Sequence, residues 1–275
     1  MAFRTLTLCG LAALAFPVSL AFADTDTERR EDDLIVTSTR LLTSEGTETV
    51  SVSVIDADDI ERLALSNLAD VLALSPGVST TRNGGFGGFA ALRLRGAPGE
   101  QTLVLIDGAL VNDTTSPGGG YNFALVDTAR IERIEVLRGP QSSLWGSDAI
   151  GGVVSITTRA PAVGQSARAL VELGSFDTRR AAADANTSAA LGGGTLSVSA
   201  GVSTLTTDGI SKADARQGNS EKDGYQASSG DLKLKWSSLS GKASLTARLG
   251  VSDTLTDIDG FSATAQGGVA DSDQT

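Results

Sequence analysis

The chain has 275 residues, a formal net charge of −11, one cysteine and no histidine. The lack of histidine excludes catalytic triads built on that residue, and an acidic chain does not suit nucleic acid, which demands a basic surface. The single cysteine, Cys9, provides neither an internal disulfide nor the usual ligand set of zinc. A pair of catalytic carboxylates and a calcium site built from oxygen atoms remain compatible with this composition.

Residues 1–23 have the three parts of a secretory signal peptide. Arg4 supplies the positive start, an apolar stretch runs from Leu6 to Phe16, and Ala21-Phe22-Ala23 has the small-x-small pattern of a cleavage site. The apolar stretch is too short for a membrane span, and the abrupt change to polar residues after it argues against a buried helix. Cleavage would remove Arg4 as the only charged residue, which moves the net charge from −11 to −12.

Residues 24–43 form a polar leader that starts with the charge run DTDTERREDD. Such a run has nothing to bury and predicts no packed structure. Inside it lies one apolar island, Leu34-Ile35-Val36-Thr37. An extended island of this kind can add as a strand to the sheet edge of another protein, or it can be the first strand of the domain that follows. The residues alone leave both interpretations open.

Residues 44–160 predict a compact α+β domain. Alternating or continuous apolar residues predict strands at 49–55, 92–96, 102–106, 131–136 and 153–156. Asp107-Gly108 follows the third of these strands and is a strong hairpin signal.

Two short helices are predicted between the first two strands of this domain. Asp56 or Asp58 can cap the first helix, which runs through Leu63. Ser66 can cap the second, and Pro76-Gly77 ends it.

Two glycine-rich loops lie between these elements, one from Asn83 to Phe89 and the other from Asn112 to Asn122. Open backbone amides beside an aromatic ring suit a contact surface, so we expect ligand binding here; a plain solvent loop is the alternative. The first loop is not a phosphate loop, because no Lys-Ser/Thr follows it, and no G-x-G-x-x-G opens a helix after a strand.

After Pro161 the sequence changes to alternating segments rich in Ala, Ser, Thr, Gly and Leu. Strands are predicted at 167–173, 180–190, 196–203, 231–236 and 244–251, with short turns at 192–194 and 238–241 and a long polar loop at 206–228. This is the pattern of a membrane barrel with its apolar side toward lipid, although a soluble antiparallel sandwich with one wet face gives the same alternation. No stretch after residue 23 predicts a spanning helix, so a membrane-spanning part would have to be a barrel.

The number of predicted strands does not close a barrel. About five strands cannot surround a domain the size of residues 44–160, because plugged outer-membrane transporters use about 22. Residues 271–275 have the polar composition of a loop. We therefore expect residues 161–275 to be the N-terminal part of a barrel in an incomplete chain.

Three motifs of the α+β domain resemble the plug domain of TonB-dependent outer-membrane receptors: LVLIDG at 103–108, VLRGP at 136–140 and GSDAIGG at 146–152. The resemblance implies an α+β plug followed by the first strands of a transmembrane antiparallel β-barrel, in the outer membrane of a Gram-negative type cell. It implies energised nutrient uptake and no catalysis. It also implies a TonB box that pairs by strand addition with the periplasmic protein TonB, made of Asp33, Leu34, Ile35, Val36, Thr37 and Ser38.

Within this family, Asn83-Gly84-Gly85 and the run GSDAIGGVV are most similar to the cobalamin receptors. This implies that two apical plug loops touch cobalamin. The residues implied are Asn83, Gly84, Gly85, Phe86, Gly87, Gly88, Phe89, Pro117, Gly118, Gly119, Gly120, Tyr121 and Asn122. Ferric-siderophore and haem receptors share the plug motifs, so they remain the alternative nutrient class.

The resemblance implies two further sets of residues. Arg95 and Arg138 would anchor the plug to barrel glutamates, with a local pair to Glu132 or Glu135 as the alternative. Outer-loop aspartates would hold calcium, although lone loop acids are usually just solvated; these are Asp208, Asp223, Asp253 and Asp259. Outside the family, a secreted β-rich adhesion or binding module and a hydrolase with paired carboxylates are the rival hypotheses.

Overall fold

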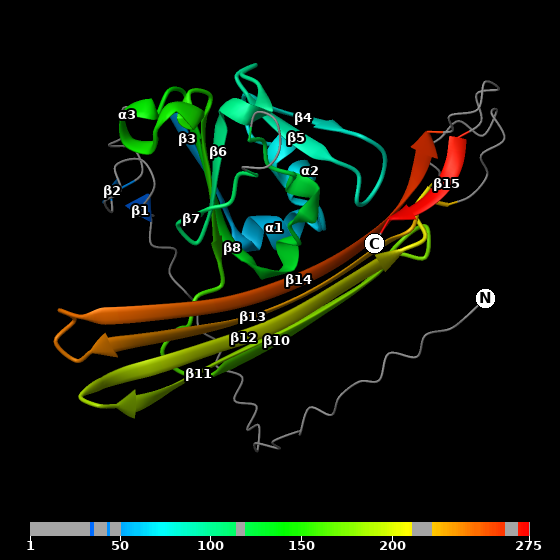
Figure 1. Cartoon of the computed structure of the whole chain (residues 1–275). Helices are drawn as coiled ribbons and strands as arrows, with labels where there is room; N and C mark the ends of the chain where they lie inside the picture. The colour runs from blue at the N-terminus through cyan, green and yellow to red at the C-terminus, as the bar shows by residue number, and fades with distance from the viewer. Residues whose placement is uncertain are drawn as a thin grey trace. The chain divides into compact units, whose positions relative to one another are not determined.

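The computed structural model describes residues 34–35, 43–44, 51–113, 119–210, 222–261 and 269–274. Its two main sheets are a five-stranded sheet of order β3-β8-β9-β6-β7 and a six-stranded sheet of order β10 to β15 (Figure 1). The pairs β1-β2 and β4-β5 form two small sheets. We call the elements from β3 to β9 the plug and the sheet β10–β15 the wall.

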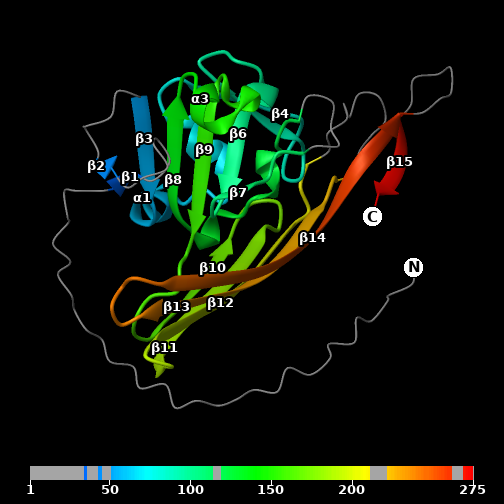
Figure 2. The same cartoon turned by 60° about the vertical axis from the view of Figure 1, so that its left-hand side comes forward.

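The plug strands run through Ser51–Asp56 (β3), Val78–Arg82 (β4), Ala90–Leu94 (β5), Thr102–Ile106 (β6), Ala109–Leu110 (β7), Ile131–Arg138 (β8) and Gly152–Thr158 (β9). The leader strands are Leu34–Ile35 (β1) and Thr43–Ser44 (β2). The wall strands are Ser166–Leu173 (β10), Arg179–Leu191 (β11), Gly194–Thr207 (β12), Tyr225–Ser238 (β13), Ser244–Phe261 (β14) and Val269–Gln274 (β15). Figure 2 shows β3, β8, β9 and β6 side by side in the plug.

The plug helices are Ala57–Leu63 (α1), Leu68–Ala73 (α2) and Ser142–Trp145 (α3). Four 3-10 turns accompany them at Gly99–Gln101, Phe123–Leu125, Thr128–Arg130 and Ser147–Ala149. In the part of the chain that the structure describes, none of the helices has the length and apolar character to cross a membrane.

The helix caps confirm one prediction and correct another. Asp56 caps α1, since its Oδ1 accepts from the backbone N–H of Asp59 at 2.8 Å. The cap of α2 is Asn67 and not Ser66, because the Oδ1 of Asn67 accepts from the backbone N–H of Ala69 at 2.8 Å. Asn67 is extended and pairs with Asp127 in an isolated bridge, which fixes it as the last residue before the helix.

The predicted hairpin at Asp107-Gly108 is confirmed. Ile106 pairs with Ala109 across the turn, and both turn residues have positive φ, 48° and 80°, as a type I′ turn requires. The polar end of the chain was predicted as a loop, and this is wrong: Val269–Gln274 is a strand that pairs with β14. Ladder pairing uses backbone groups, so a polar segment can join a sheet without an apolar face.

The plug core lies between its five-stranded sheet and α2. Its largest fully buried apolar side chains are Leu68, Leu72, Leu92, Leu94, Val104, Phe123, Ile131, Ile134 and Ile156. Many of them come from β8, β9 and β6, which the motif-bearing segments supply. The plug thus has the apolar core and polar loops of a conventional water-soluble domain.

The wall has the opposite burial. Ser199, Ser203 and Lys233 are between 3% and 7% exposed, whereas Val202, Leu249 and Leu173 are 60%, 70% and 80% exposed. The register keeps the two faces apart, with Ser199 opposite Lys233 and Val202 opposite Gly230. A sandwich in water buries its apolar side, so this arrangement is that of a partial barrel whose apolar face lies outward.

Candidate functional site

The first glycine loop connects β4 to β5 and is tightly closed. The backbone N–H of Asn83 donates to the carbonyl of Phe89 at 3.0 Å, and that of Gly88 donates to Gly85 at 3.3 Å. A Cβ on Gly88 would lie 1.9 Å from the carbonyl oxygen of Asn83, so no other residue fits there without a shift. The loop is therefore a compact turn and holds its aromatic rings in fixed places.

The second glycine loop is held by Asn112 at one end. The amide of Asn112 donates to the carbonyls of Thr102 at 3.0 Å and Gly119 at 2.9 Å, and its Oδ1 accepts from Val104 at 2.7 Å. Pro117 and Gly118 lie outside the described residues, so the structure places only part of this predicted loop.

Asn122 links the two loops. Its Oδ1 accepts from the backbone N–H of Ala90 at 2.9 Å and from that of Ala124 at 3.1 Å. Ala90 comes directly after the first loop, and Asn122 closes the second. One amide side chain therefore fixes the two predicted binding loops relative to each other.

Residues of both loops line one hollow of about 270 Å³. Its lining consists of Phe89, Ala91, Arg93, Pro98, Gly99, Glu100, Gly120 and Tyr121. Phe89 as a residue is 48% exposed, which leaves it free to contact a ligand. Tyr121 packs edge-on against Phe123 at 5.1 Å between ring centroids, and burial raises the pKa of its phenol to about 12. The hollow combines two aromatic rings and small residues with one cation, Arg93, and one carboxylate, Glu100.

The plug touches the wall through charges, with Asp107 at the centre of one group. Its carboxylate lies 3.0 Å from Nζ of Lys233 and pairs with Arg248, both on the polar face of the wall. It also accepts from the N–H of Thr158 at 2.8 Å and from its hydroxyl at 2.7 Å. Lys233 in turn donates to the carbonyl of Thr158 at 2.7 Å. One turn aspartate thereby joins the end of β9 to two wall strands.

A second group centres on Arg130 and Arg180. Arg130 of the plug pairs with Asp231 of β13, and burial, as the largest influence, lowers the pKa of its guanidinium. Arg180 of β11 pairs with Asp127 of the plug and with Glu172 at 2.6 Å. These side chains are mostly buried, so each charge needs its partner.

Near α1, two arginines share one carboxylate of the plug. Arg168 of β10 lies 2.6 Å from Glu61, and Arg159 lies 3.4 Å from the same oxygen. Arg159 follows β9 and also approaches Asp184 of β11 at 3.9 Å. This pair of contacts extends the charged interface to the helix side of the plug.

The sequence reasoning missed most of these residues. Asp107 was interpreted as a turn residue only, and Asp127 and Arg130 were not singled out. A signal was present on the wall, because Asp231, Lys233 and Arg248 lie on the polar face of strands whose other face is apolar. Charges that point to the interior of a barrel need opposite charges from whatever fills it.

The predicted anchors Arg95 and Arg138 lie elsewhere. Arg138 is buried at the end of β8 and donates to the carbonyl of Pro76. Arg95, with a positive φ of 50°, lies beside it against Gly77 and Gly139. Glu135, one of the alternative partners, pairs with Arg133 at 3.0 Å. Anchoring of Arg95 and Arg138 to barrel glutamates stays a prediction.

The aspartates predicted to hold calcium are not brought together in the described residues. Asp208 pairs with Lys222 at 2.8 Å, Asp223 is buried, and Asp253 lies on the outward face of β14 between apolar neighbours. The side chain of Asp259 lies outside the described residues. Within the described ranges, no group of three or more His, Cys, Asp or Glu side chains is placed to hold a metal ion.

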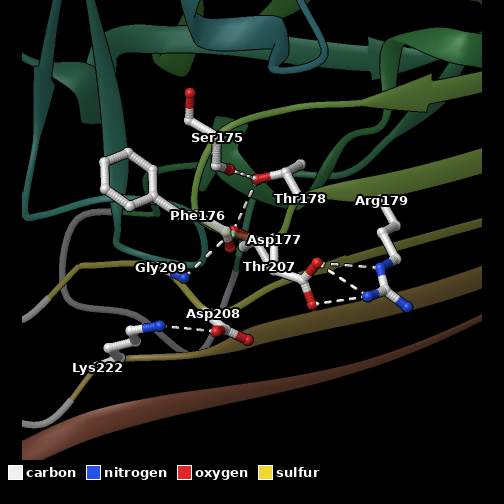
Figure 3. Close-up of polar contacts among 9 residues, drawn as sticks. All are labelled: Ser175, Phe176, Asp177, Thr178, Arg179, Thr207, Asp208, Gly209 and Lys222. Carbon is white, nitrogen blue, oxygen red and sulfur yellow. Dashed lines mark hydrogen bonds and ion pairs between the residues drawn. The ribbon is translucent and has the colours of Figure 1, made fainter.

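Asp208 instead belongs to a polar rim where two connections of the wall meet (Figure 3). The hydroxyl of Thr178 donates to the carbonyl of Ser175 at 2.6 Å and lies 2.8 Å from that of Thr207. Arg179 pairs with Asp177 at 2.9 Å. These contacts tie the β10–β11 turn to the end of β12, beside a cleft of about 560 Å³ that is also lined by Tyr225 and Asp257.

The predicted TonB box falls mostly outside the described residues. Leu34–Ile35 pairs antiparallel with Thr43–Ser44 in a sheet of its own. The five-stranded sheet has β3 at its edge, so this island is not the first strand of the plug sheet. Asp33 and Val36, Thr37 and Ser38 are not described.

Comparisons with known proteins agree with this architecture. Residues 45–153 match the family described as TonB-dependent Receptor Plug Domain. The vitamin B12 transporter BtuB of Vibrio vulnificus strain YJ016 is 37% identical over 155 residues, which cover 56% of this chain and 25% of that protein. The vitamin B12 transporter BtuB of Vibrio cholerae O395 is 34% identical over 167 residues, covering 61% and 27%. The chain thus spans about a quarter of the length of these relatives.

Solved structures with a similar fold include outer-membrane and siderophore receptors. The pyoverdine outer membrane receptor FpvA of Pseudomonas aeruginosa PAO1 aligns with a TM-score of 0.68 at 20% identity, covering 86% of this chain and 33% of that one. The siderophore receptor PirA of the same species aligns with a TM-score of 0.54 at 28% identity, covering 74% and 34%. With its plug, its inverted wall and these matches, the chain belongs to the family of TonB-dependent outer-membrane receptors.

Proposed function

We propose that the protein takes up cobalamin actively across the outer membrane and catalyses no bond change. The observation that carries this proposal is the charged interface between the plug and the polar face of the wall. An apolar plug interface would exclude water and resist separation, whereas ion pairs and hydrogen bonds can exchange their partners for water. A plug held in this way can shift against the wall while its own apolar core stays folded.

The proposed cycle uses the residues described above. Cobalamin lands in the hollow between the two glycine loops, near Phe89 and Tyr121. The leader strand that includes Leu34 and Ile35 pairs with periplasmic TonB by strand addition, in which backbone hydrogen bonds provide the affinity. Work transmitted through TonB then displaces part of the plug, and the substrate passes along the polar wall.

The relatives support cobalamin over other nutrients. Both Vibrio proteins named above are vitamin B12 transporters, and they match at 34% and 37% identity. A ferric siderophore is the second candidate, because solved structures of similar fold include the siderophore receptor PirA. Their shared fold does not decide the substrate.

Deletion of Leu34 to Thr37 in the complete protein tests the TonB part of the proposal. Cells that lack their own cobalamin receptor would express this variant, and uptake of radiolabelled cyanocobalamin would be measured beside binding to isolated outer membranes. We expect uptake to stop and binding to persist, because only the contact with TonB is removed. Deletion of the four polar leader residues Asp26 to Arg29 is the matched control and should leave both unchanged.

Normal uptake by the Leu34–Thr37 deletion would remove the TonB-box assignment. If the wild-type protein transports a ferric siderophore but not cyanocobalamin, the second candidate is supported. Recovery of the complete protein from the soluble fraction would favour a secreted binding module and contradict both.

A further inference from the structure

The first glycine loop has a second contact that ligand binding alone does not explain. The ring of Phe86 stacks on that of Tyr225, with centroids 6.2 Å apart and planes inclined by 21°. Tyr225 is the first residue of wall strand β13 and is 6% exposed. A loop of the plug therefore rests with an aromatic ring on a buried ring of the wall.

Gly87 brings the loop backbone onto the same place. Its φ is +76°, and a Cβ there would lie 2.5 Å from the ring of Tyr225 and 2.7 Å from Thr256. A Cβ added to neighbouring Gly85 would lie 3.7 Å from the side chain of Ile210. Close approach of backbone to wall is what glycine permits here, so Phe86 and Gly87 both touch the wall, and Gly85 lies near the connection that follows β12.

The opposite end of this loop lines the candidate ligand hollow. Phe89 belongs to that hollow, whereas Tyr225 does not. The hydrogen bonds from Asn83 to Phe89 and from Gly88 to Gly85 brace the loop from its base to its tip, so we expect it to shift as one unit. A displacement of Phe86 from the wall would therefore also displace Phe89.

We propose that the Phe86–Tyr225 stack clamps the loop Asn83–Phe89 in the conformation that lines the ligand hollow. Tyr225 is then a positioning residue for ligand binding, although it lies on the wall and outside the hollow. The positioning role of Tyr225 rests on the proposed function, whereas the clamp on the loop does not. Holding a binding loop in its bound conformation raises affinity by lowering the ordering cost of binding.

Hydrogen exchange on the complete, detergent-solubilised protein without ligand tests the clamp. Tyr225→Leu removes the ring, and an aromatic pair is worth enough to raise exchange at residues 83–89 by about 2- to 13-fold. Tyr225→Phe keeps the ring and is the matched control, with exchange at the wild-type level. Wild-type exchange in Tyr225→Leu would overturn the clamp.

Binding of cyanocobalamin to the same proteins tests the positioning role. We expect Tyr225→Leu to bind cyanocobalamin more weakly, by at most the factor seen in exchange, because binding falls with the fraction of closed loop. Tyr225→Phe should bind at the wild-type level. Faster exchange with undiminished binding would overturn the positioning role. A wild-type protein that does not bind cyanocobalamin would count against the proposed substrate alone, because the exchange result needs no ligand.

Gly87→Ala provides an independent route to the same loop. The added Cβ collides with Tyr225, so exchange at residues 83–89 should rise in the variant. Gly96→Ala is the control for backbone strain, since Gly96 has a φ of +83° and open space around its Cβ position. Equal exchange at residues 83–89 in both variants would contradict a contact between loop and wall.

Discussion

The plug and the wall of this protein obey opposite burial rules. In the plug, Leu94, Ile134 and Val154 are 0% exposed, as in any domain that folds in water. In the wall, Ser199 and Lys233 are buried, and Leu245 and Val251 are 71% and 66% exposed. Since the same chain carries both patterns, the difference reports two surroundings: the outward face of the wall has lipid as its solvent, and the inward face has the plug.

The two regions also differ in what a single change can break. The plug core is held by apolar packing, which is lost only when the domain unfolds. The interface is held by charges such as Asp107, Arg130 and Arg180, whose partners water can replace once the plug has shifted from the wall. The uptake proposed above, in which the plug moves without unfolding, requires this division.

The largest effect is expected from Asp107→Asn. Asparagine keeps the hairpin conformation but leaves Lys233 and Arg248 without their carboxylate, and removing one partner of a buried pair costs about 3–5 kcal/mol. The loss should appear as faster hydrogen exchange of the plug segments at 102–110 in the detergent-solubilised protein. Adding Lys233→Met should recover part of the loss, because it removes an unpaired charge. No change in Asp107→Asn would contradict the interface.

A matched pair of leucine variants sharpens the comparison between the regions. Leu94→Ala in the plug core should destabilise the plug by about 2–5 kcal/mol, because the cavity cannot close fully. Leu249→Ala on the outward face of β14 should destabilise the protein much less than Leu94→Ala, since lipid fills the space left by the side chain. Denaturant unfolding of both variants in detergent micelles provides the measurement. Similar losses of unfolding free energy in the two variants would contradict the different surroundings of the two leucines.

The smallest loss of stability is expected at the start of α2, where substitutions of two neighbouring polar residues are compared. Asn67→Ala should cost about 1 kcal/mol, because it removes the cap of the helix. Ser66→Ala should cost a few tenths at most, since surface substitutions usually do. Thermal unfolding of the two variants compares them directly, and a reversed order would support the cap that the sequence predicted.

The fold was predictable where one local pattern dominated. Strand β6 at Thr102–Ile106 and the hairpin at Asp107-Gly108 matched their apolar run and their turn signal. The cap at Ser66 was wrong because serine and asparagine are equally good caps, and only the bridge from Asn67 to Asp127 decides between them. Strand β4, Val78–Arg82, carries no clear alternation and was not predicted.

The candidate site was less predictable than the fold. Glycines and aromatics marked both loops, but the hydrogen bonds of Asn122 that join them depend on tertiary structure. The partners of Asp107 lie 126 and 141 positions further along the chain at Lys233 and Arg248, so no local pattern connects them. The stack of Phe86 on Tyr225 likewise joins two residues that lie far apart in the chain.

Nitroxide labels on single cysteines along β12, in the protein reconstituted into lipid bilayers, test the two surroundings most directly. The measurement is the accessibility of each label to oxygen, which is concentrated in lipid, and to a water-soluble nickel complex. Labels at Val198, Ala200 and Val202 should be accessible to oxygen, and labels at Ser199 and Ser203 should be shielded by the plug. Nickel accessibility at Val202, or oxygen accessibility at Ser199 and Ser203 as high as at their neighbours, would contradict a lipid-facing wall around a plug.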